Sequence, residues 1–241
     1  MKKVCVILYS GGCDSTLAAA VSADKYEKVQ LVTYNRLGFF KARENAMINL
    51  ERLKQKFGPD KFCLKIIDVN NTFKKIQYDN YIYYIQKYGS ICMSICGLCK
   101  LAMHWQTILY CMENSITDVC DGAVKEMSVF PTQNMNIALK NTIKLYEDFN
   151  INYYNPVYEI GKDVEKILYD MQIIPSKKHK LTDADKQVVC SQQILFANFV
   201  KYYLSEHSWD EYVSNLHDFY SEKINDIRNE ISKASHIDLK G

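Results

Sequence analysis

Residues 4–16 read VCVILYSGGCDST, and this stretch predicts how the chain folds. Residues 4–9 are an uninterrupted apolar run, which is typical of a strand buried on both faces of a parallel sheet. Ser10-Gly11-Gly12 ends the run, and residues 16–23 then have the pattern of a helix. A buried strand that turns through glycines into a helix is the expected first unit of a parallel α/β fold.

The rest of the chain continues this alternation of strand and helix patterns. Further strands are expected at residues 29–35, 62–69, 118–121 and 153–158. Further helices are expected at residues 41–57, 72–88, 96–113, 134–147 and 163–172. The order predicts an α/β fold, a doubly wound parallel sheet, in a domain over residues 1–186. Residues 187–241 carry mainly helical patterns and are expected to form a C-terminal helical appendage on the sheet domain or on a second subunit.

The composition limits the classes of function. The chain has 30 Lys and Arg against 28 Asp and Glu, a net charge of +2, which disfavours binding of nucleic acid through bulk charge. Its apolar runs are all shorter than the roughly 18 residues of a membrane-spanning helix, and the N-terminus lacks a signal-peptide cleavage site, so a cytoplasmic protein without a membrane partner is expected. Nine cysteines are odd in number and too sparse for a disulfide scaffold, which favours reduced thiols with metal or sulfur chemistry.

The loop at residues 10–16 lies where α/β proteins bind ligands, beyond the carboxyl end of the first strand. Gly11 and Gly12 let the backbone curl with its N–H groups inward, and the helix start adds a positive dipole end. Three side chains add hydroxyl donors for phosphate oxygens: Ser10, Ser15 and Thr16. Asp14 is negative, so it is expected to act through Mg²⁺ or to brace the loop. An ordinary tight turn before a helix is the structural alternative.

The string SGGCDS at residues 10–15 resembles the SGGxDS motif of PP-loop ATP pyrophosphatases, and the chain has no Walker-type GK[ST] sequence. The resemblance implies an adenine nucleotide α-hydrolase-like sheet, with ATP and Mg²⁺ as cofactors. It also implies that a carbonyl oxygen of the substrate attacks the α-phosphate, which releases pyrophosphate and gives an adenylated intermediate. A nitrogen or sulfur nucleophile then displaces AMP.

The same resemblance implies roles for individual residues. The pyrophosphate would be held by the loop residues Ser10, Gly11, Gly12, Asp14, Ser15 and Thr16. Asp14 would be a catalytic residue and a candidate Mg²⁺ ligand. Thr33 and Tyr34 lie at the end of the second strand, where the family holds adenine, and Lys162 lies where related enzymes place a lysine that meets ATP phosphates.

Cys92, Cys96 and Cys99 lie within eight residues of one another. Cys96 and Cys99 are expected at a helix start, where the dipole, Lys100 and His104 favour the reactive thiolate. A pair of half-buried core cysteines is the alternative. The spacing also occurs in radical-SAM proteins, but those need a different barrel fold. Five other cysteines lie in or beside apolar segments and are expected in the core: Cys5, Cys13, Cys63, Cys111 and Cys120.

Some PP-loop tRNA thiolation enzymes have a CxxC after the third strand and a lone cysteine far downstream, and here Cys190 follows Cys99 by 91 positions. The resemblance implies that Cys96, Cys99 and Cys190 bind a [4Fe–4S] cluster or carry a persulfide. A Zn²⁺ site with Cys92 as the fourth ligand is the rival metal site. A catalytic Cys96 or Cys99 without a metal is the third possibility.

These features together predict an ATP-dependent enzyme that replaces a carbonyl oxygen of a nucleobase-like substrate with sulfur. The expected partners are ATP, a sulfur donor, a free base or tRNA, and a second copy in a homodimer. One alternative is a nitrogen-adding ligase similar to 7-cyano-7-deazaguanine synthase, although Cys190 is the only cysteine after Cys120 and the family's zinc cluster near the C-terminus lacks its ligands. The other alternative is a non-catalytic adenine-nucleotide-binding module.

Several charged residues are weaker candidates, because a solvated role explains each of them equally well or better. Lys125 and Glu126 follow the fourth strand and are candidate polar contacts for the substrate. Arg36 and Lys41 follow the second strand and are candidate phosphate contacts. The basic run at residues 176–180, SKKHK, is a candidate contact for RNA phosphates.

Overall fold

The computed structural model describes residues 3–36, 40–93, 95–125, 136–176 and 191–235. Five parallel strands form one sheet in the order β3-β2-β1-β4-β5. Their bounds are β1 Val4–Leu8, β2 Lys28–Asn35, β3 Phe62–Asp68, β4 Asp118–Asp121 and β5 Asn152–Tyr154. The chain builds outward from β1 to β3 and then returns to the other side of β1. This reversal makes the sheet doubly wound, and the carboxyl end of β1 lies at the switch point, the position where sheets of this type commonly bind ligands.

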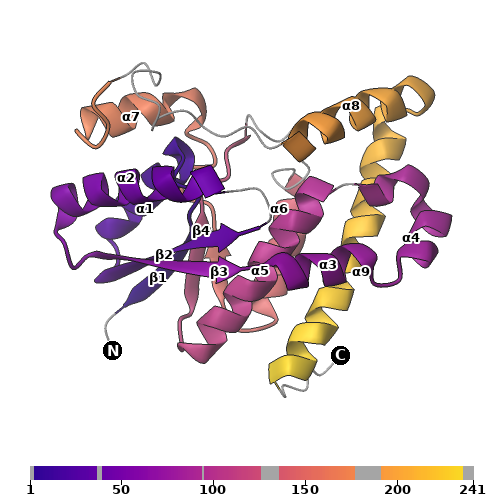
Figure 1. Ribbon diagram of the computed structural model, residues 1–241, viewed down its shortest axis with the longest axis horizontal. Helices are drawn as coiled ribbons and strands as arrows, with labels where there is room; N and C mark the ends of the chain where they lie inside the picture. The colour runs from indigo at the N-terminus through magenta and orange to yellow at the C-terminus, as the bar shows by residue number, and fades with distance from the viewer. Residues whose placement is uncertain (1–2, 37–39, 94, 126–135, 177–190, 236–241) are drawn as a thin grey trace.

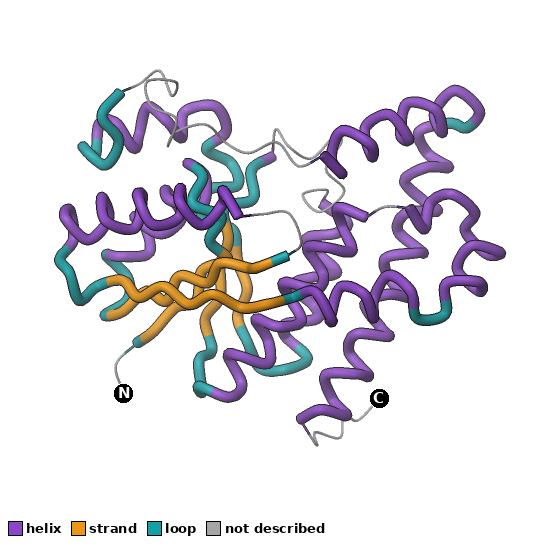
Figure 2. Tube along the Cα trace, in the orientation of Figure 1, coloured by secondary structure: helices purple, strands orange, loops and turns teal. Residues whose placement is uncertain are grey.

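Helices cover both faces of the sheet (Figure 1). Their bounds are α1 Cys13–Ala23, α2 Phe40–Phe57, α3 Asn70–Tyr78, α4 Tyr81–Tyr88, α5 Ile95–Glu113, α6 Asn136–Glu147, α7 Val164–Asp170, α8 Ser191–Glu206 and α9 Trp209–Ser235. Figures 1 and 2 show α1, α2 and α7 over one face, and α5 and α6 over the other. The predicted doubly wound α/β fold is therefore confirmed.

The central strand β1 is buried on both faces, as its apolar run predicts. Cys5 and Ile7 face the hydrophobic cluster beneath α1, α2 and α7. Val6 and Leu8 face the second cluster, which also contains side chains of α5, α6, α8 and α9. Because side chains alternate along a strand, a fully apolar β1 contributes to both clusters at once.

The C-terminal helices pack against the helices on one side of the sheet. Residues of α9 contact α4, α5 and α6, and Leu216, Phe219 and Tyr220 are buried there. Trp209, at the start of α9, is exposed. The helical appendage is confirmed, whereas the domain boundary at residue 186 lies outside the described residues and stays a prediction.

The structure differs from the sequence prediction at several elements. The helix expected at residues 72–88 is two helices, because Asn80 adopts a left-handed conformation with φ of 58°. β5 ends at Tyr154 rather than at residue 158, since Pro156 has no N–H for a sheet hydrogen bond. Cys63 was expected in the core but is exposed, because it lies on the edge strand β3.

Candidate functional site at the carboxyl ends of β1 and β4

The loop after β1 leads directly into α1. Gly11 has a φ of 78°, a left-handed conformation that glycine adopts without steric cost. Gly12 is the N-cap of α1 in an extended conformation, and it offers no side chain to cap the helix. A helix that begins without a side-chain cap presents its first-turn N–H groups to an anion at this end. The backbone therefore suits phosphate binding.

The three hydroxyl side chains of the loop have different surroundings. Ser15 and Thr16 are buried and both donate to the carbonyl of Gly12, at 3.1 and 2.8 Å. Ser10 is exposed at the loop surface, and its Oγ accepts from the N–H of Gly12 at 3.3 Å and lies 3.1 Å from Ser15 Oγ. In this structure Ser15 and Thr16 brace the loop, whereas Ser10 faces outward. Their predicted contacts with phosphate stay predictions.

Asn49 of α2, which is not among the residues predicted from the sequence, supports the loop from the side. Its buried Nδ2 donates to the carbonyl of Gly11 at 2.7 Å, and its Oδ1 accepts from Arg52 Nη1 at 2.9 Å. Asn49 lies between the buried positions Ala46 and Leu50 of an amphipathic helix. A polar residue on the apolar face of a helix is the signal that would have identified it.

The end of β4 touches the start of α1. Asp121, the last residue of β4, pairs with Leu8 of β1, and Gly122 follows it. A Cβ atom built on Gly122 would lie only 2.4 Å from the backbone nitrogen of Ser15. Only glycine allows this close approach of two backbones, so the carboxyl ends of β1 and β4 share one rim.

Asp121 is a fully buried carboxylate with three partners. Its Oδ1 accepts from the N–H of Ala123 at 2.9 Å and from Asn155 Nδ2, and its Oδ2 lies 2.6 Å from Lys100 Nζ. Burial raises the pKa of the Asp121 carboxyl, but Lys100 and the other partners outweigh this and hold the pKa below its usual value. Asp121 therefore stays ionised and fixes the ammonium group of Lys100.

His104 lies one turn after Lys100 on α5 and is buried among aromatic side chains. Its Nδ1 is 3.0 Å from Tyr146 Oη, and its ring meets the rings of Tyr146 and Tyr153 edge-on. Burial, with a contribution from the charge of Lys100, lowers the pKa of His104 to about 3. The imidazole is consequently neutral at physiological pH and is a packing and hydrogen-bonding group.

The cysteine pair lies at the start of α5, as predicted. Cys96 is partly buried and Cys99 is buried, while Cys92 donates its thiol to the carbonyl of Gly89 at 3.0 Å. Between residues 3 and 235, outside the segments that the structure leaves undescribed, no three His, Cys, Asp or Glu side chains are arranged to hold a metal ion. Cys190 lies outside the described residues, so its predicted meeting with Cys96 and Cys99 stays a prediction.

The predicted adenine contacts, Thr33 and Tyr34, have buried side chains that form hydrogen bonds within the protein. Thr33 Oγ1 donates to the carbonyl of Tyr9 at 2.8 Å, and the hydroxyl of Tyr34 lies 2.5 Å from Thr107 Oγ1. Both side chains are buried, and both residues are in β2 beside the start of the loop. Their role toward adenine stays a prediction.

The remaining candidates are placed as follows. Arg36 is buried with its guanidinium 3.6 Å from the ring centroid of Phe73, and exposed Lys125 pairs with Glu159 at 3.1 Å. Lys162 lies in a short 3₁₀ helix at Gly161–Asp163, and its side chain is outside the described part. The same holds for the side chain of Lys41, for Glu126 and for the basic run from residue 177 onward.

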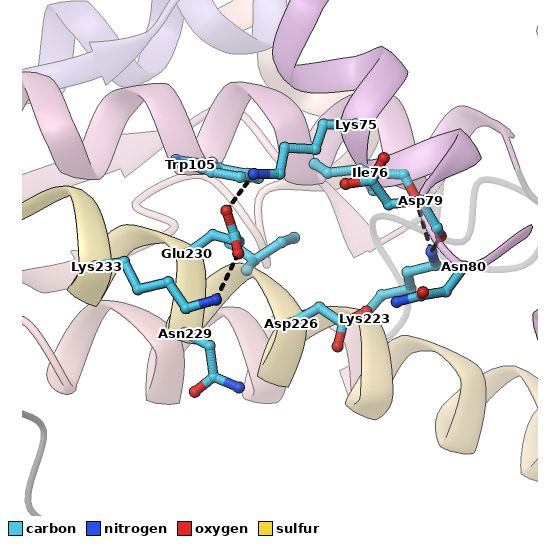
Figure 3. A pocket seen from close by; sticks show the side chains of 11 residues that line it. Lys75, Ile76, Asp79, Asn80, Trp105, Lys223, Asp226, Asn229, Glu230 and Lys233 are labelled. Atoms are coloured by element: carbon cyan, nitrogen blue, oxygen red, sulfur yellow. Dashed lines mark hydrogen bonds and ion pairs between the residues drawn. The ribbon is translucent and has the colours of Figure 1, made fainter.

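A pocket of about 210 Å³ lies between α3, α5 and α9, and its lining includes no residue of the loop (Figure 3). Its charged side chains already bind protein groups: Glu230 pairs with Lys75 and, at 3.0 Å, with Lys233. The buried Lys223 donates to the carbonyl of Ile76 at 2.7 Å, and burial lowers its pKa. The contacts of Glu230 with Lys75 and of Lys223 with Ile76 attach α9 to α3, and we assign the pocket a structural role.

The fold and the site define a class: an α/β protein with a doubly wound parallel sheet and a glycine-containing loop after its first strand. The chain matches no known protein-family model and no curated protein sequence. Among solved structures it is similar to a predicted subunit of tRNA methyltransferase from Methanocaldococcus jannaschii, with a TM-score of 0.41 and 21% identity over 70% of this chain and 74% of that chain. So distant a likeness carries no conclusion about function. Within the described residues, no helix has both the length and the apolar character needed to cross a membrane.

Proposed function

We propose that this chain is a PP-loop-type ATP pyrophosphatase that activates a carbonyl oxygen of a nucleobase-like substrate and replaces it with sulfur. The observation that carries the proposal is the SGGCDS loop at the carboxyl end of β1, within which α1 starts at Cys13. The left-handed Gly11 and the N-cap Gly12, which has no side chain, shape a backbone that suits the polyphosphate of ATP.

In the first step, the carbonyl oxygen of the substrate attacks the α-phosphorus of ATP. The bond from this phosphorus to the bridging oxygen breaks, and pyrophosphate leaves with the electron pair. We assign the loop the role of holding the leaving pyrophosphate, and Asp14 the role of binding Mg²⁺, which neutralises phosphate charge when bound. Thr33 and Tyr34 are the proposed neighbours of adenine, and Lys162 is a proposed phosphate contact.

In the second step, sulfur displaces AMP. A persulfide on Cys96 or Cys99 attacks the activated carbon with its terminal sulfur, and the bond from this carbon to the AMP oxygen breaks. The other cysteine then attacks the sulfur-bearing cysteine, releases the thiolated product and leaves a disulfide that an external dithiol must reduce. A [4Fe–4S] cluster or Zn²⁺ on Cys96, Cys99 and Cys190 is the metal form of the same proposal.

The position of α5 supports a shared site for the two steps. Cys96 and Lys100 are four residues apart on one face of α5. Lys100 Nζ contacts Asp121, whose neighbour Gly122 packs on the backbone of Ser15. A continuous set of contacts therefore joins the helix that carries the cysteine pair to the phosphate loop.

The direct test is turnover with ATP and candidate acceptors, a free base and a tRNA, followed by detection of AMP, pyrophosphate and product mass. We expect pyrophosphate release and a product with sulfur in place of oxygen. Cys96→Ser and Cys99→Ser should lose the thiolated product but keep ATP–pyrophosphate exchange with the acceptor. Cys63→Ser, which changes an exposed cysteine on β3, is the matched control and should behave as the wild type.

The other outcomes identify the alternative functions. A sulfur-free product with new nitrogen would identify a nitrogen-adding ligase, and tight ATP binding without turnover would identify a nucleotide-binding module. Iron and zinc analysis of anaerobically purified protein separates the metal form from the thiol form. RNA binding across a salt series separates tRNA from a free base as the acceptor, because phosphate contacts weaken steeply with salt.

A further inference from the structure

Lys100 is held at the rim of the phosphate loop by a buried acid. It follows Cys99 on α5, and its Nζ lies 2.6 Å from Oδ2 of Asp121, the last residue of β4. Figure 1 shows α5 returning alongside the sheet to the start of β4, so the beginning of α5 lies toward the edge where the strands end. Gly122, next to Asp121, touches the backbone of Ser15. The ammonium group is therefore close to the proposed nucleotide site.

The two partners of this ion pair have very different surroundings. The side chain of Asp121 is 1% exposed, and its Oδ1 accepts from Ala123 and Asn155. The side chain of Lys100 is 24% exposed. In the described part of the chain, Asp121 is the one acceptor that Lys100 Nζ contacts. A lysine ammonium has three N–H donors, so a cation held by one carboxylate has donors available for a ligand.

Other lysine pairs in the structure differ from this one. Lys75 and Lys87 pair with Glu230 and Glu222, and these pairs attach α9 to α3 and α4. All four of those side chains are considerably more exposed than Asp121. A buried carboxylate with two further donors holds its lysine in one place, which suits the recognition of an anion better than the attachment of two helices.

We propose that Lys100 is a further residue of the nucleotide site, which donates to an anionic phosphate oxygen of ATP while Asp121 holds the ammonium in place. The inference rests on the proposed function and extends it. It adds a phosphate-binding lysine, which lies on the same helix as Cys96 and Cys99. Asp121 is a positioning residue in this arrangement, and it acts through Lys100.

The test is calorimetric binding of ATP and of inorganic pyrophosphate to the full chain. The double variant Lys100→Met/Asp121→Asn leaves no unpaired charge, and an asparagine still accepts from Ala123. We expect this variant to bind both ligands about 10- to 100-fold more weakly, the usual effect of losing a hydrogen bond from a charged group. Lys75→Met, which removes an ion-paired lysine at the α3–α9 contact, is the matched control and should bind as the wild type.

Three single variants distinguish a direct contact of Lys100 with the phosphate from the anchoring of Lys100 by Asp121. Lys100→Gln keeps a donor for Asp121 but removes the charge, and it provides the same test if the double variant does not fold. Asp121→Asn keeps the ammonium but loosens it, so we expect a smaller loss of affinity. Lys100→Arg should restore part of the binding, because it keeps the charge.

The outcomes separate this inference from the function on which it rests. If the wild type binds neither ATP nor pyrophosphate, the proposed function fails and Lys100 with it. If the wild type binds both and the folded Lys100 variants bind as tightly as Lys75→Met, the role of Lys100 is overturned and the proposed function stands. Weaker binding by the Lys100 variants alone supports the inference.

Discussion

Gly11 allows a direct test of the loop at the scale of one residue. Its φ of 78° suits glycine, and a side chain in this region costs about 1–2 kcal/mol. We expect Gly11→Ala to lower the affinity for ATP, because relief of the strain would rotate the carbonyl that accepts from Asn49. Calorimetric titration with ATP measures the effect.

Gly58 provides the control for this substitution. It also has a positive φ, of 106°, and a Cβ added there would meet no atom within 4 Å. It lies in the turn between α2 and β3, so Gly58→Ala should cost similar stability and leave ATP binding unchanged. Equal ATP affinities for the two variants would contradict the role assigned to the loop.

The lowered pKa of the buried His104 predicts how the free energy of unfolding depends on pH. Its pKa is lowered from 6.5 to about 3 in the folded chain, so the unfolded chain binds the additional proton between these values. The contribution of His104 to the free energy of unfolding is therefore fully present above the pKa of the unfolded chain, and it falls as the pH drops toward 3. From pH 7 to pH 5 the contribution of His104 to the free energy of unfolding should fall by about 2 kcal/mol.

Urea unfolding at the two pH values measures this dependence. His104→Gln removes the titrating group and should lose about 2 kcal/mol less between pH 7 and pH 5 than the wild type. An unchanged pH dependence in His104→Gln would show that another group causes it.

Single residues of the site were predictable from sequence where the signal is local. The loop residues Gly11 and Gly12 follow from one continuous motif, because a strand, a turn and a helix start are adjacent in the chain. The contacts of Asn49 with Gly11 and of Lys100 with Asp121 join segments that are distant in the sequence, so no local motif predicts them. Cys63 was misplaced because an apolar pattern does not distinguish an edge strand from a central one.

At the scale of elements, α5 and α9 meet through Gly97 and Tyr220. A Cβ built on Gly97 would lie 1.2 Å from Tyr220 Oη and 2.2 Å from Cζ. Glycine to alanine in a helix normally stabilises by about 1 kcal/mol. Here we expect Gly97→Ala to destabilise by about 1–3 kcal/mol, because the buried ring must move.

Whether Gly97→Ala lowers or raises the free energy of unfolding shows whether Tyr220 packs on Gly97. In a Tyr220→Leu background the ring is gone, and Gly97→Ala should become neutral or stabilising. Urea unfolding of the two single variants and the double variant gives the coupling energy. If the effects of the two single variants on the free energy of unfolding were additive, Tyr220 of α9 would not pack on Gly97 of α5 as the structure shows.

Helix boundaries show where element prediction from sequence fails. The segment at residues 72–88 has a continuous helical pattern, yet the chain breaks at Asn80. The pair Asp79-Asn80 is a turn signal that the apolar periodicity on both sides outweighed. In contrast, β4 was predicted with its observed bounds, since its short apolar run is flanked by polar residues and followed by glycine.

At the scale of the whole molecule, α9 completes one of the two hydrophobic clusters. Phe219 packs on the rings of Tyr84 and Tyr88, and Arg228 Nε pairs with Asp148 at 2.5 Å. We expect a chain that ends at Glu206 to lose its cooperative thermal transition and to bind a hydrophobic dye, because the cluster is then open to water.

A chain that ends at Ser235 is the control for this truncation. It keeps every described residue of α9 and should unfold like the full chain. Circular dichroism with dye fluorescence measures both variants. A cooperative transition in the shorter chain would show that the sheet domain folds without α9.

The parallel sheet was predictable because each strand and the helix after it are continuous in sequence, and parallel strands need such crossovers. The packing of α8 and α9 against α5 was not predictable in detail. An amphipathic helix shows that it has an apolar face but does not show which surface covers it.

The strand order has a consequence for self-association. β3 is an outer strand of the sheet, and Lys65 and Asp68 are exposed along it. Charged side chains on an outer strand oppose the addition of a strand from another molecule. Two copies of this chain that form a dimer are therefore not expected to join their sheets at β3 into one continuous sheet.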